Sequence, residues 1–343
     1  MSTAVAAVLL VAIATYAVFG GADFGAGFWD LTAGGPERGA AARDLVQRSI
    51  GPVWEANHVW LIFIFVVTWS AFPEAFQSIT LTMFVPLALA AFGIVLRGAS
   101  FAFRKTMVTV RVRRAFGGLF ALSSVLVPFC FGAVAGGIVS GRVPAGGVAG
   151  DPVGSWLNPT SLVTGGFAVV AAAYLAAVFL VREARRTGDA GLAGYFRRRA
   201  VAGALVAAVV AVIGFAVLSS SAPHVFDRLF TWALPAVVLS VLGGFGALLL
   251  LVRGVARGAR VLAVVAVACV IFGWGVAQWP YLLPESLTVA AAAAPTGTLV
   301  TLLIAGGLAA LLVLPGFVLL YVLDQRRLLP EEGVADAADR AGG

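Results

Sequence analysis

Three polar side chains able to carry protons interrupt the apolar runs of this sequence. Glu55 and His58 stand three residues apart in the stretch IGPVWEANHVWLI (50–62), and Asp23 lies in the earlier stretch GGADFGAGFWD. Residues three apart share one face of a helix, and buried carboxyls and histidines can exchange protons near neutral pH. The pattern predicts either a proton relay or a structural arrangement. In the structural arrangement, Glu55 complements the helix dipole, and His58 and Asn57 bond neighbouring helices.

Long apolar segments must position these side chains. Hydrophobic residues make up 61% of the chain and the mean hydropathy is +1.01, which predicts an integral membrane protein. The predicted fold is all-α, with about nine transmembrane helices arranged as two four-helix bundles plus one peripheral helix. It divides into a transmembrane helical domain, 1–329, and a disordered cytoplasmic tail, 330–343. The segments long enough to cross a bilayer are about 3–29, 53–72, 76–97, 115–139, 160–181, 200–219, 229–252, 259–279 and 296–323.

The basic residues predict how these helices are oriented. When the connections alternate between two sides, one side holds all of the 23 Lys and Arg residues except Arg142 and Arg228. By the positive-inside rule that side is cytoplasmic, so the N-terminus is outside and the C-terminus inside. The same distribution accounts for a pI near 10.2 without nucleic acid as a partner. Asp23 and Glu55 then lie at comparable depth in the inner leaflet.

Side chains that ligate haem or metal are few. The stock is His58, His224, three Met and two Cys, and both Cys130 and Cys269 sit in apolar segments, which is typical of packing residues. We therefore expect no haem or metal bound by this chain alone, and no catalytic residue within it. Arg97, at the cytoplasmic end of the third segment, fits topology and lipid headgroup contact better than catalysis.

Small residues predict where the chain packs closely and where it turns. The glycines around Asp23 are expected to let another helix approach closely enough to bury this aspartate; they are Gly20, Gly21, Gly25 and Gly27. The outer loop 141–159 is rich in Gly and Pro, so we expect it to be flexible. The polar patch GWGVAQWPYLLPESLT (273–288) is expected to close the eighth segment at the outer face.

Several stretches, taken together, resemble subunit II of the cytochrome bd-type quinol oxidases. The resemblance runs in order over about residues 10–325, and its first two motifs are the most specific. It implies a respiratory terminal oxidase of a prokaryotic inner membrane that oxidises quinol and reduces oxygen to water. The motifs are GGADFGAGFWDL, IGPVWEANHVWLI, LRGASFAFR (96–104), WLNPTSLVTG (156–165), GWGVAQWPYLLPESLTV (273–289) and AAAPTGTLVTLL (292–303).

The resemblance also implies how the work is divided between subunits. Haem b, haem d and the quinol loop belong to subunit I, while subunit II carries no haem ligands and stabilises the haem-bearing subunit through an interface within the membrane. In some members subunit II contributes acidic residues to a cytoplasmic proton route. The resemblance leaves room for a structural quinone in this chain and for small accessory subunits, with membrane lipid around the complex.

The motifs carry the family's site residues onto this chain. Asp23 matches the aspartate of the first motif and Glu55 the acidic position of the second, with His58 as a supporting neighbour. These three are the predicted proton pathway. The supporting residues of the motifs are Trp54, Asn57, Trp60 and Arg97.

Two departures from the family pattern concern the proton route. Some members carry acidic residues where this chain has Gly20 and Ala102, so a relay built on those positions is absent or rerouted here. A proton-coupled secondary transporter, with Asp23 and Glu55 as its coupling pair, is the alternative function. The odd span count and the lack of a clear inverted repeat argue against a transporter.

Overall fold

The computed structural model describes residues 1–35, 37–106, 110–255 and 257–325. Within its helices the side chains are described except those of residues 50–56, 101–102, 104–106, 110–115, 314, 317–318, 320–321 and 324–325. The side chains of Trp54, Glu55 and Ala102 therefore lie outside the described part. The predicted disordered tail, 330–343, lies outside it as well.

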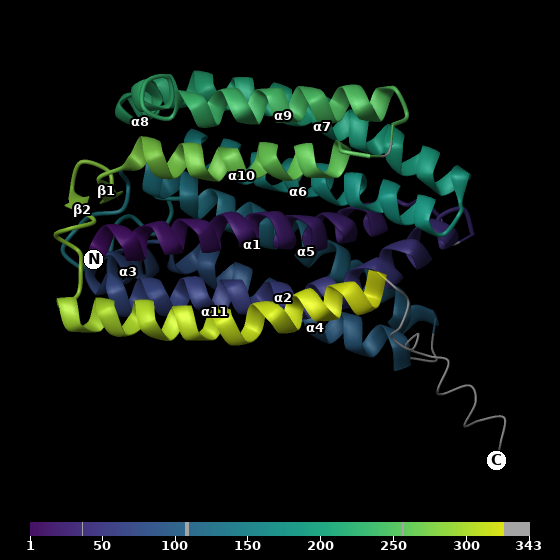
Figure 1. Cartoon of the computed structure of the whole chain (residues 1–343), viewed down its shortest axis with the longest axis horizontal. Helices are drawn as coiled ribbons and strands as arrows, with labels where there is room; N and C mark the ends of the chain where they lie inside the picture. The colour runs from purple at the N-terminus through teal and green to yellow at the C-terminus, as the bar shows by residue number, and fades with distance from the viewer. Residues whose placement is uncertain (36, 107–109, 256, 326–343) are drawn as a thin grey trace, which may run out of the picture. The chain divides into compact units, whose positions relative to one another are not determined.

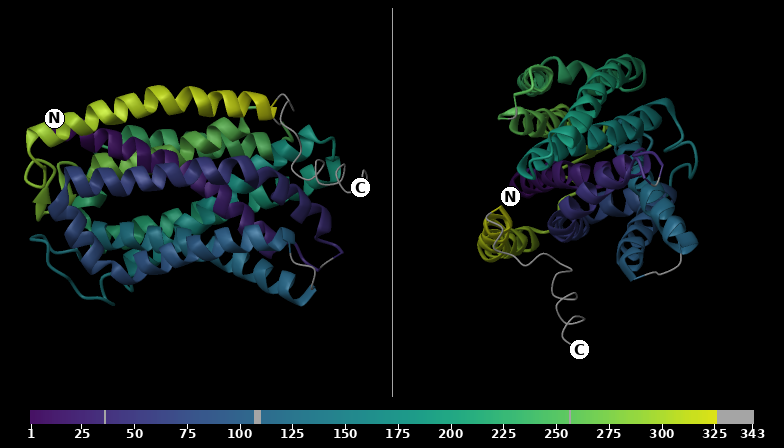
Figure 2. Two further views of the ribbon diagram at one scale, coloured as in Figure 1. Left: turned by 90° about the horizontal axis from the view of Figure 1, so that it is seen from below. Right: turned by 90° about the vertical axis from the view of Figure 1, so that its right-hand side faces the viewer.

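The described chain is almost entirely helical, as expected of a chain whose backbone must satisfy its own hydrogen bonds in lipid. A short antiparallel hairpin, β1 (Tyr281–Leu283) and β2 (Leu287–Thr288), follows α10. Residues 2–294 form one compact unit whose long helices run roughly side by side (Figures 1 and 2), and α11 belongs to a second unit. The helices are α1 (Ser2–Leu31), α2 (Ala40–Ala71), α3 (Pro73–Thr82), α4 (Phe84–Thr106), α5 (Val110–Val139), α6 (Pro159–Arg186), α7 (Ala190–Ser221), α8 (Pro223–Leu229), α9 (Leu234–Val252), α10 (Ala259–Gln278) and α11 (Thr296–Gln325).

Seven helices of the described chain are long and apolar enough to cross a membrane: α1, α5, α6, α7, α9, α10 and α11. The bent pair α2 and α3 makes an eighth if it forms one span, and the apolar part of α4, Phe84–Ser100, is shorter. Helical backbone covers most of each of the nine predicted segments, although Met83 interrupts the third between α3 and α4. The predicted multi-pass helical fold is confirmed, while the number nine stays a prediction.

Two long helices end at a proline that starts a short helix. Pro73 begins α3, which is bent by 119° from α2, and Pro223 begins α8 after α7. The preceding residues adopt similar backbone angles, φ −137° and ψ 60° at Phe72 and φ −146° and ψ 60° at Ala222. Proline disfavours the helical conformation of the residue before it, and its missing N–H costs nothing in a first helical turn. Residues 2–139 and 159–278 thus repeat one order of helices, while the predicted division into two four-helix bundles stays a prediction.

The loop between α5 and α6 takes a defined path over α3. Backbone amides of three glycines donate to side chains on one face of that helix: Gly146 to Glu74 Oε1 (2.8 Å), Gly147 to Ser78 Oγ (3.0 Å) and Gly150 to Thr82 Oγ1 (2.9 Å). The composition predicted a flexible loop, and that prediction is wrong. Side chains spaced four apart on α3 supply partners that the loop's own composition does not reveal.

Candidate functional site: a buried ion pair between three helices

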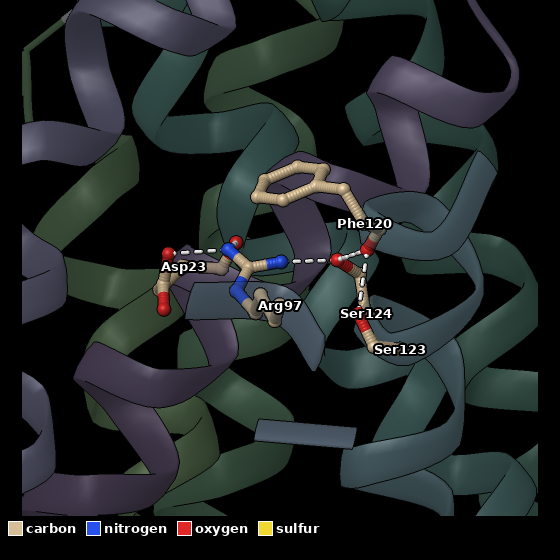
Figure 3. Close-up of polar contacts among 5 residues, drawn as sticks. All are labelled: Asp23, Arg97, Phe120, Ser123 and Ser124. Carbon is tan, nitrogen blue, oxygen red and sulfur yellow. Dashed lines mark hydrogen bonds and ion pairs between the residues drawn. The ribbon is translucent and has the colours of Figure 1, made fainter. Parts of the chain in front are cut away.

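A salt bridge between Asp23 of α1 and Arg97 of α4 lies in the interior of the bundle. The Arg97 Nη2 atom is 2.6 Å from Asp23 Oδ1 and also donates to the Asp23 backbone carbonyl at 2.9 Å (Figure 3). Asp23 is 2% exposed and Arg97 is 0% exposed. An isolated charge is costly within a membrane protein, so each residue makes the burial of the other tolerable.

Helix α5 completes the surroundings of the guanidinium group. Arg97 Nη1 donates to Ser124 Oγ, which in turn donates to the Phe120 carbonyl at 2.6 Å (Figure 3). The guanidinium carbon lies 4.3 Å from the centroid of the Phe120 ring and 5.0 Å from that of Phe24. The prediction that Arg97 contacts lipid headgroups is therefore wrong. Its side chain folds back into the protein because a buried carboxylate, a hydroxyl and two ring faces receive it there.

Glycines on α1 make this burial possible. A Cβ added at Gly25 would collide with the Ala172 carbonyl group of α6, and one at Gly27 would collide with Ser124 Oγ and come within 2.8 Å of Arg97 Nη1. Only a residue without a side chain fits between such close neighbours. The predicted packing role is confirmed for these two glycines, which bring α5 and α6 against the helix that carries Asp23.

Around the ion pair, several buried polar atoms have no hydrogen-bond partner within the described protein. They are Asp23 Oδ2, Arg97 Nε, Ser100 Oγ, both amide atoms of Asn57 and the hydroxyl of Tyr16. Buried polar groups in proteins normally find a partner, and ordered water is the usual one where protein atoms do not serve. The interior between α1, α2 and α4 therefore has the chemistry of a small hydrated core.

The predicted second-motif residues lie on α2 at different depths. Asn57 is fully buried, and a Cβ added at Gly20 would lie 3.1 Å from its Nδ2 atom, so α1 and α2 touch here. His58 and Trp60 are half-buried, and the Trp60 ring packs edge-on against Phe63 with centroids 6.4 Å apart. The structure brings Asn57 to α1 beside Gly20. For Glu55 and Trp54 it places the backbone within α2 only.

Sequence reasoning missed the partners of Arg97 and a further acidic residue. Ser124, the serine that accepts from Arg97, is a small hydroxyl residue in an apolar run, and nothing in its spacing points to Arg97. Asp30, about two turns after Asp23 on the same helix, is 5% exposed and was not singled out. Two adjacent serines inside a transmembrane segment, Ser123 and Ser124, are the signal that could have been followed.

Among the described residues, no three His, Cys, Asp or Glu side chains are grouped so that they could hold a metal ion. Cys130 is buried and Cys269 is half-buried, and both are free thiols. Carboxylate, guanidinium, hydroxyl and amide groups meet at the site, so its residues can pair charges and form hydrogen bonds.

Comparison with known proteins shows which proteins this chain is similar to. A family model described as cytochrome bd terminal oxidase subunit II matches residues 1–324. A cytochrome bd menaquinol oxidase subunit II of Bacillus subtilis (strain 168) is 23% identical over 331 residues, which cover 92% of this chain and 94% of that protein. The cytochrome bd ubiquinol oxidase subunit 2 of the same organism is 26% identical over 224 residues, 65% of this chain and 64% of that protein.

A solved structure shares the fold. The bd oxidase from Geobacillus thermodenitrificans contains a chain that matches with a TM-score of 0.80 and 25% sequence identity. The match covers 94% of this chain and 98% of that chain. The order and packing of the helices described above are therefore those of a known oxidase subunit.

Proposed function

Because the chain belongs to the cytochrome bd terminal oxidase subunit II family, we propose that it scaffolds a haem-bearing subunit I and supplies protons to that subunit from the cytoplasm. The complex oxidises quinol and reduces oxygen to water, with haem b and haem d in subunit I. This chain spans the membrane nine times, with its N-terminus outside and its C-terminus in the cytoplasm. The proton-coupled transporter has no observation in its favour.

The group of unpartnered buried polar atoms carries the proton part of the proposal. Asp23 Oδ1 is held by Arg97, while the buried Asp23 Oδ2 has no partner among the described residues, so one oxygen is fixed and the other is left to accept from a buried water molecule. Asn57 presents two more unpartnered atoms from α2, the helix that also carries Glu55 and His58. Water molecules that satisfy these atoms would link the two helices, and Glu55 is the carboxyl that gains and loses the proton.

The ion pair itself has a structural part in this scheme. Arg97 ties α4 to α1 through Asp23 and to α5 through Ser124. Three helices that pack around one guanidinium group keep their relative positions, so the neighbouring polar atoms stay within reach of each other. The pair anchors the pathway, and the proton moves beside it.

The scaffolding part of the proposal concerns the outward face of α2, α3 and α4. Large aromatic side chains are exposed there, including Trp69 at 64%, Phe84 at 68% and Phe92 at 60%. The exposed large hydrophobic side chains of α7 and α9, both fully described, are aliphatic except Phe245. Protein interfaces are enriched in aromatic residues, so the face of α2 to α4 is the one that meets subunit I.

The decisive test compares a glutamate in the middle of α2 with one in the first turn of α3. Glu55→Gln removes the proposed proton carrier, and Glu74→Gln changes a carboxylate on α3 whose acceptor role for the Gly146 amide a glutamine carbonyl can keep. We expect Glu55→Gln to lower quinol-driven oxygen consumption by about tenfold or more. Glu74→Gln should retain the activity, and both complexes should keep their haem spectra. Full turnover in assembled Glu55→Gln would exclude a proton role for this residue.

A second comparison separates proton transfer from assembly. Asn57→Leu replaces a buried amide without protein partners by an apolar side chain of similar size, which should leave the complex assembled. If water at Asn57 belongs to the route, oxygen consumption falls while haem content stays constant. Loss of haem together with activity would instead make Asn57 a structural residue.

A further inference from the structure

The end of the bundle opposite the hairpin carries a dense group of arginines. Segments 182–199 and 253–260 lie at the α6 to α7 and α9 to α10 turns, on the right in Figure 1, and they hold nine arginines but only two acidic residues, Glu183 and Asp189. Part of this charge is topological, since basic residues collect in cytoplasmic connections. Topology alone does not explain how individual arginines are placed around a groove.

Both acidic residues already have defined partners. Glu183 Oε1 accepts from Arg186 Nε at 3.0 Å, and Asp189 Oδ1 accepts from the Leu192 amide at 2.8 Å as the N-cap of α7. Within the described chain neither carboxylate forms a salt bridge with Arg197 or Arg198. Two cations therefore stand side by side on α7, and no carboxylate of the described residues forms a salt bridge with either.

These two arginines line a groove of about 230 Å³ between α7 and α9. The other lining residues are aliphatic: Val201 on α7, and Leu251 and Val252 on α9. Arg197 lies beside the turn after α9, since a Cβ built at Gly254, where φ is +71°, would be 2.9 Å from its Nη1 atom. The groove thus combines paired positive charge at its mouth with an apolar wall.

An apolar surface continues from the groove along the same two helices. Val252 is 60% exposed and Leu205, one turn beyond Val201, is 53% exposed. Further along are Val209 on α7 and Phe245 on α9, both exposed. A ligand with an anionic head and a long hydrocarbon tail matches this sequence of surfaces from end to end.

We propose that this groove binds an anionic phospholipid from the leaflet at the basic end of the bundle. The phosphate lies between Arg197 and Arg198, and an acyl chain follows Val201 and Val252 along α7 and α9. The choice of a lipid over free phosphate rests on the aliphatic wall, which offers nothing to a small inorganic anion. The site is independent of the proton pathway, since it lies on helices that do not carry Asp23, Asn57 or Arg97.

The test measures lipid retention by the purified oxidase complex. Native mass spectrometry after detergent extraction, with phosphatidylglycerol or phosphatidylcholine added, reports how many lipids stay bound. Arg197→Gln with Arg198→Gln should lower phosphatidylglycerol binding by about tenfold or more, since each basic residue near an anionic lipid contributes on the order of tenfold or somewhat less. Arg182→Gln with Arg257→Gln removes the same charge at the same end but outside the groove, and it should bind as the wild type does.

A second variant tests the apolar wall without changing charge. Val201→Trp should fill the groove and displace the lipid while both arginines remain. An equal loss of binding in the Arg182 and Arg257 control would show general attraction to a basic surface and overturn the proposal. Equal retention of phosphatidylcholine, unchanged binding in Val201→Trp, or full displacement by inorganic phosphate would overturn it too.

Discussion

The two halves of the large unit share a plan and differ in what they bury. In α1 to α5 and in α6 to α10, a 32-residue second helix ends before a proline that starts a short helix. The first half encloses Asp23 and Arg97 among hydroxyl and amide groups. The core of the second half is built from apolar residues such as Leu175, Val178 and Ala263.

The difference shows that one scaffold can serve two purposes. Alanine-rich contacts among α6, α7, α9 and α10 need only van der Waals packing, so the second half holds together without buried charge. In the first half, the same arrangement of helices encloses an ion pair and several polar atoms that have no partner among the described residues. Polar interiors of this kind are costly in a membrane, so the first half is where we place the proposed proton transfer.

Removing one member of the ion pair should give the largest effect and bring out the comparison most clearly. Arg97→Gln leaves the Asp23 carboxylate buried without its cation, which should cost about 3–5 kcal/mol of stability. In the second half, Ser240→Ala removes the hydrogen bond from Ser240 Oγ to the Ala266 carbonyl and should cost about 1 kcal/mol. Thermal unfolding of the purified complex measures both.

The double variant Asp23→Asn with Arg97→Gln completes this test. Neither buried charge is left unpaired, so most of the stability lost in Arg97→Gln should return. Stability that stays as low as in the single variant would contradict a pairing role. Recovered stability without recovered oxygen consumption would separate the anchoring role of the pair from a further role of Asp23 in proton transfer.

Adding one methyl group at a buried glycine should destabilise the first half more than the second. The expected difference is smaller than that for the ion pair. Gly25→Ala drives a Cβ into the Ala172 carbonyl group, whereas the Cβ of Gly203→Ala on α7 meets Tyr174 Cα at 3.3 Å, a tight contact that a shift of a few tenths of an ångström relieves. We expect a loss of about 1–3 kcal/mol for Gly25→Ala from overpacking. Gly203→Ala should be close to neutral, since alanine is the better helix former. Equal unfolding temperatures for the two variants would contradict the claim that α1 packs more tightly against α6 than α7 does.

Exposed side chains of the first half should contribute more to the binding of subunit I than those of the second half. The effect of each residue is expected to be smaller than the effects above. Trp69→Ala with Phe92→Ala truncates two aromatics on α2 and α4, and Leu242→Ala with Phe245→Ala truncates two equally exposed residues on α9. Each interface aromatic should contribute about 1 kcal/mol or more to subunit association. The first variant should therefore lose subunit I during affinity purification, and the second should keep it. Loss of subunit I in the second variant alone would reverse the assigned face.

The sequence was informative where composition or a short motif decides the outcome. Apolar runs predicted the helices, and the motif around Asp23 predicted both its burial and the glycine packing that encloses it. It was uninformative where a contact joins distant segments. Arg97 stands 74 residues after Asp23, and its position at a helix end is typical of lipid-facing arginines, so only the packing of α4 on α1 and α5 reveals the pair.

The same limit applied to the outer loop, whose glycines predicted flexibility. Its fastening to Glu74, Ser78 and Thr82 depends on a helix that lies about 70 residues earlier in the chain. The break of the third predicted segment at Met83 was hidden for another reason. Hydropathy is continuous across it, and the proline at 73 had already turned the chain into a short separate helix.

The smallest expected effect is a difference in acid sensitivity between the connections that follow α5 and α10. In the first, Asp151 Oδ1 accepts from the Val153 and Gly154 amides at 2.9 and 3.0 Å, and these hydrogen bonds lower the pKa of Asp151 below its ordinary value. In the second connection, the comparable hydrogen bond is made by an uncharged side chain: Gln278 Nε2 donates to the Leu282 carbonyl at 2.7 Å. Only the first should therefore respond to acid.

A carboxyl whose pKa is lowered by folding stabilises the folded form above its unfolded pKa and loses that contribution as the pH falls through the folded pKa. Hydrogen exchange of the Val153 and Gly154 amides, corrected for intrinsic rates, should thus accelerate slightly as the pH drops below about 4, the ordinary aspartate range. The hairpin amides of 281–288 should show no such change, and Asp151→Asn should abolish the response of the loop. Because Asp151 is exposed to solvent, its hydrogen bonds and that of Gln278 differ little in strength at neutral pH. Acid is the condition that reveals which connection depends on a charge.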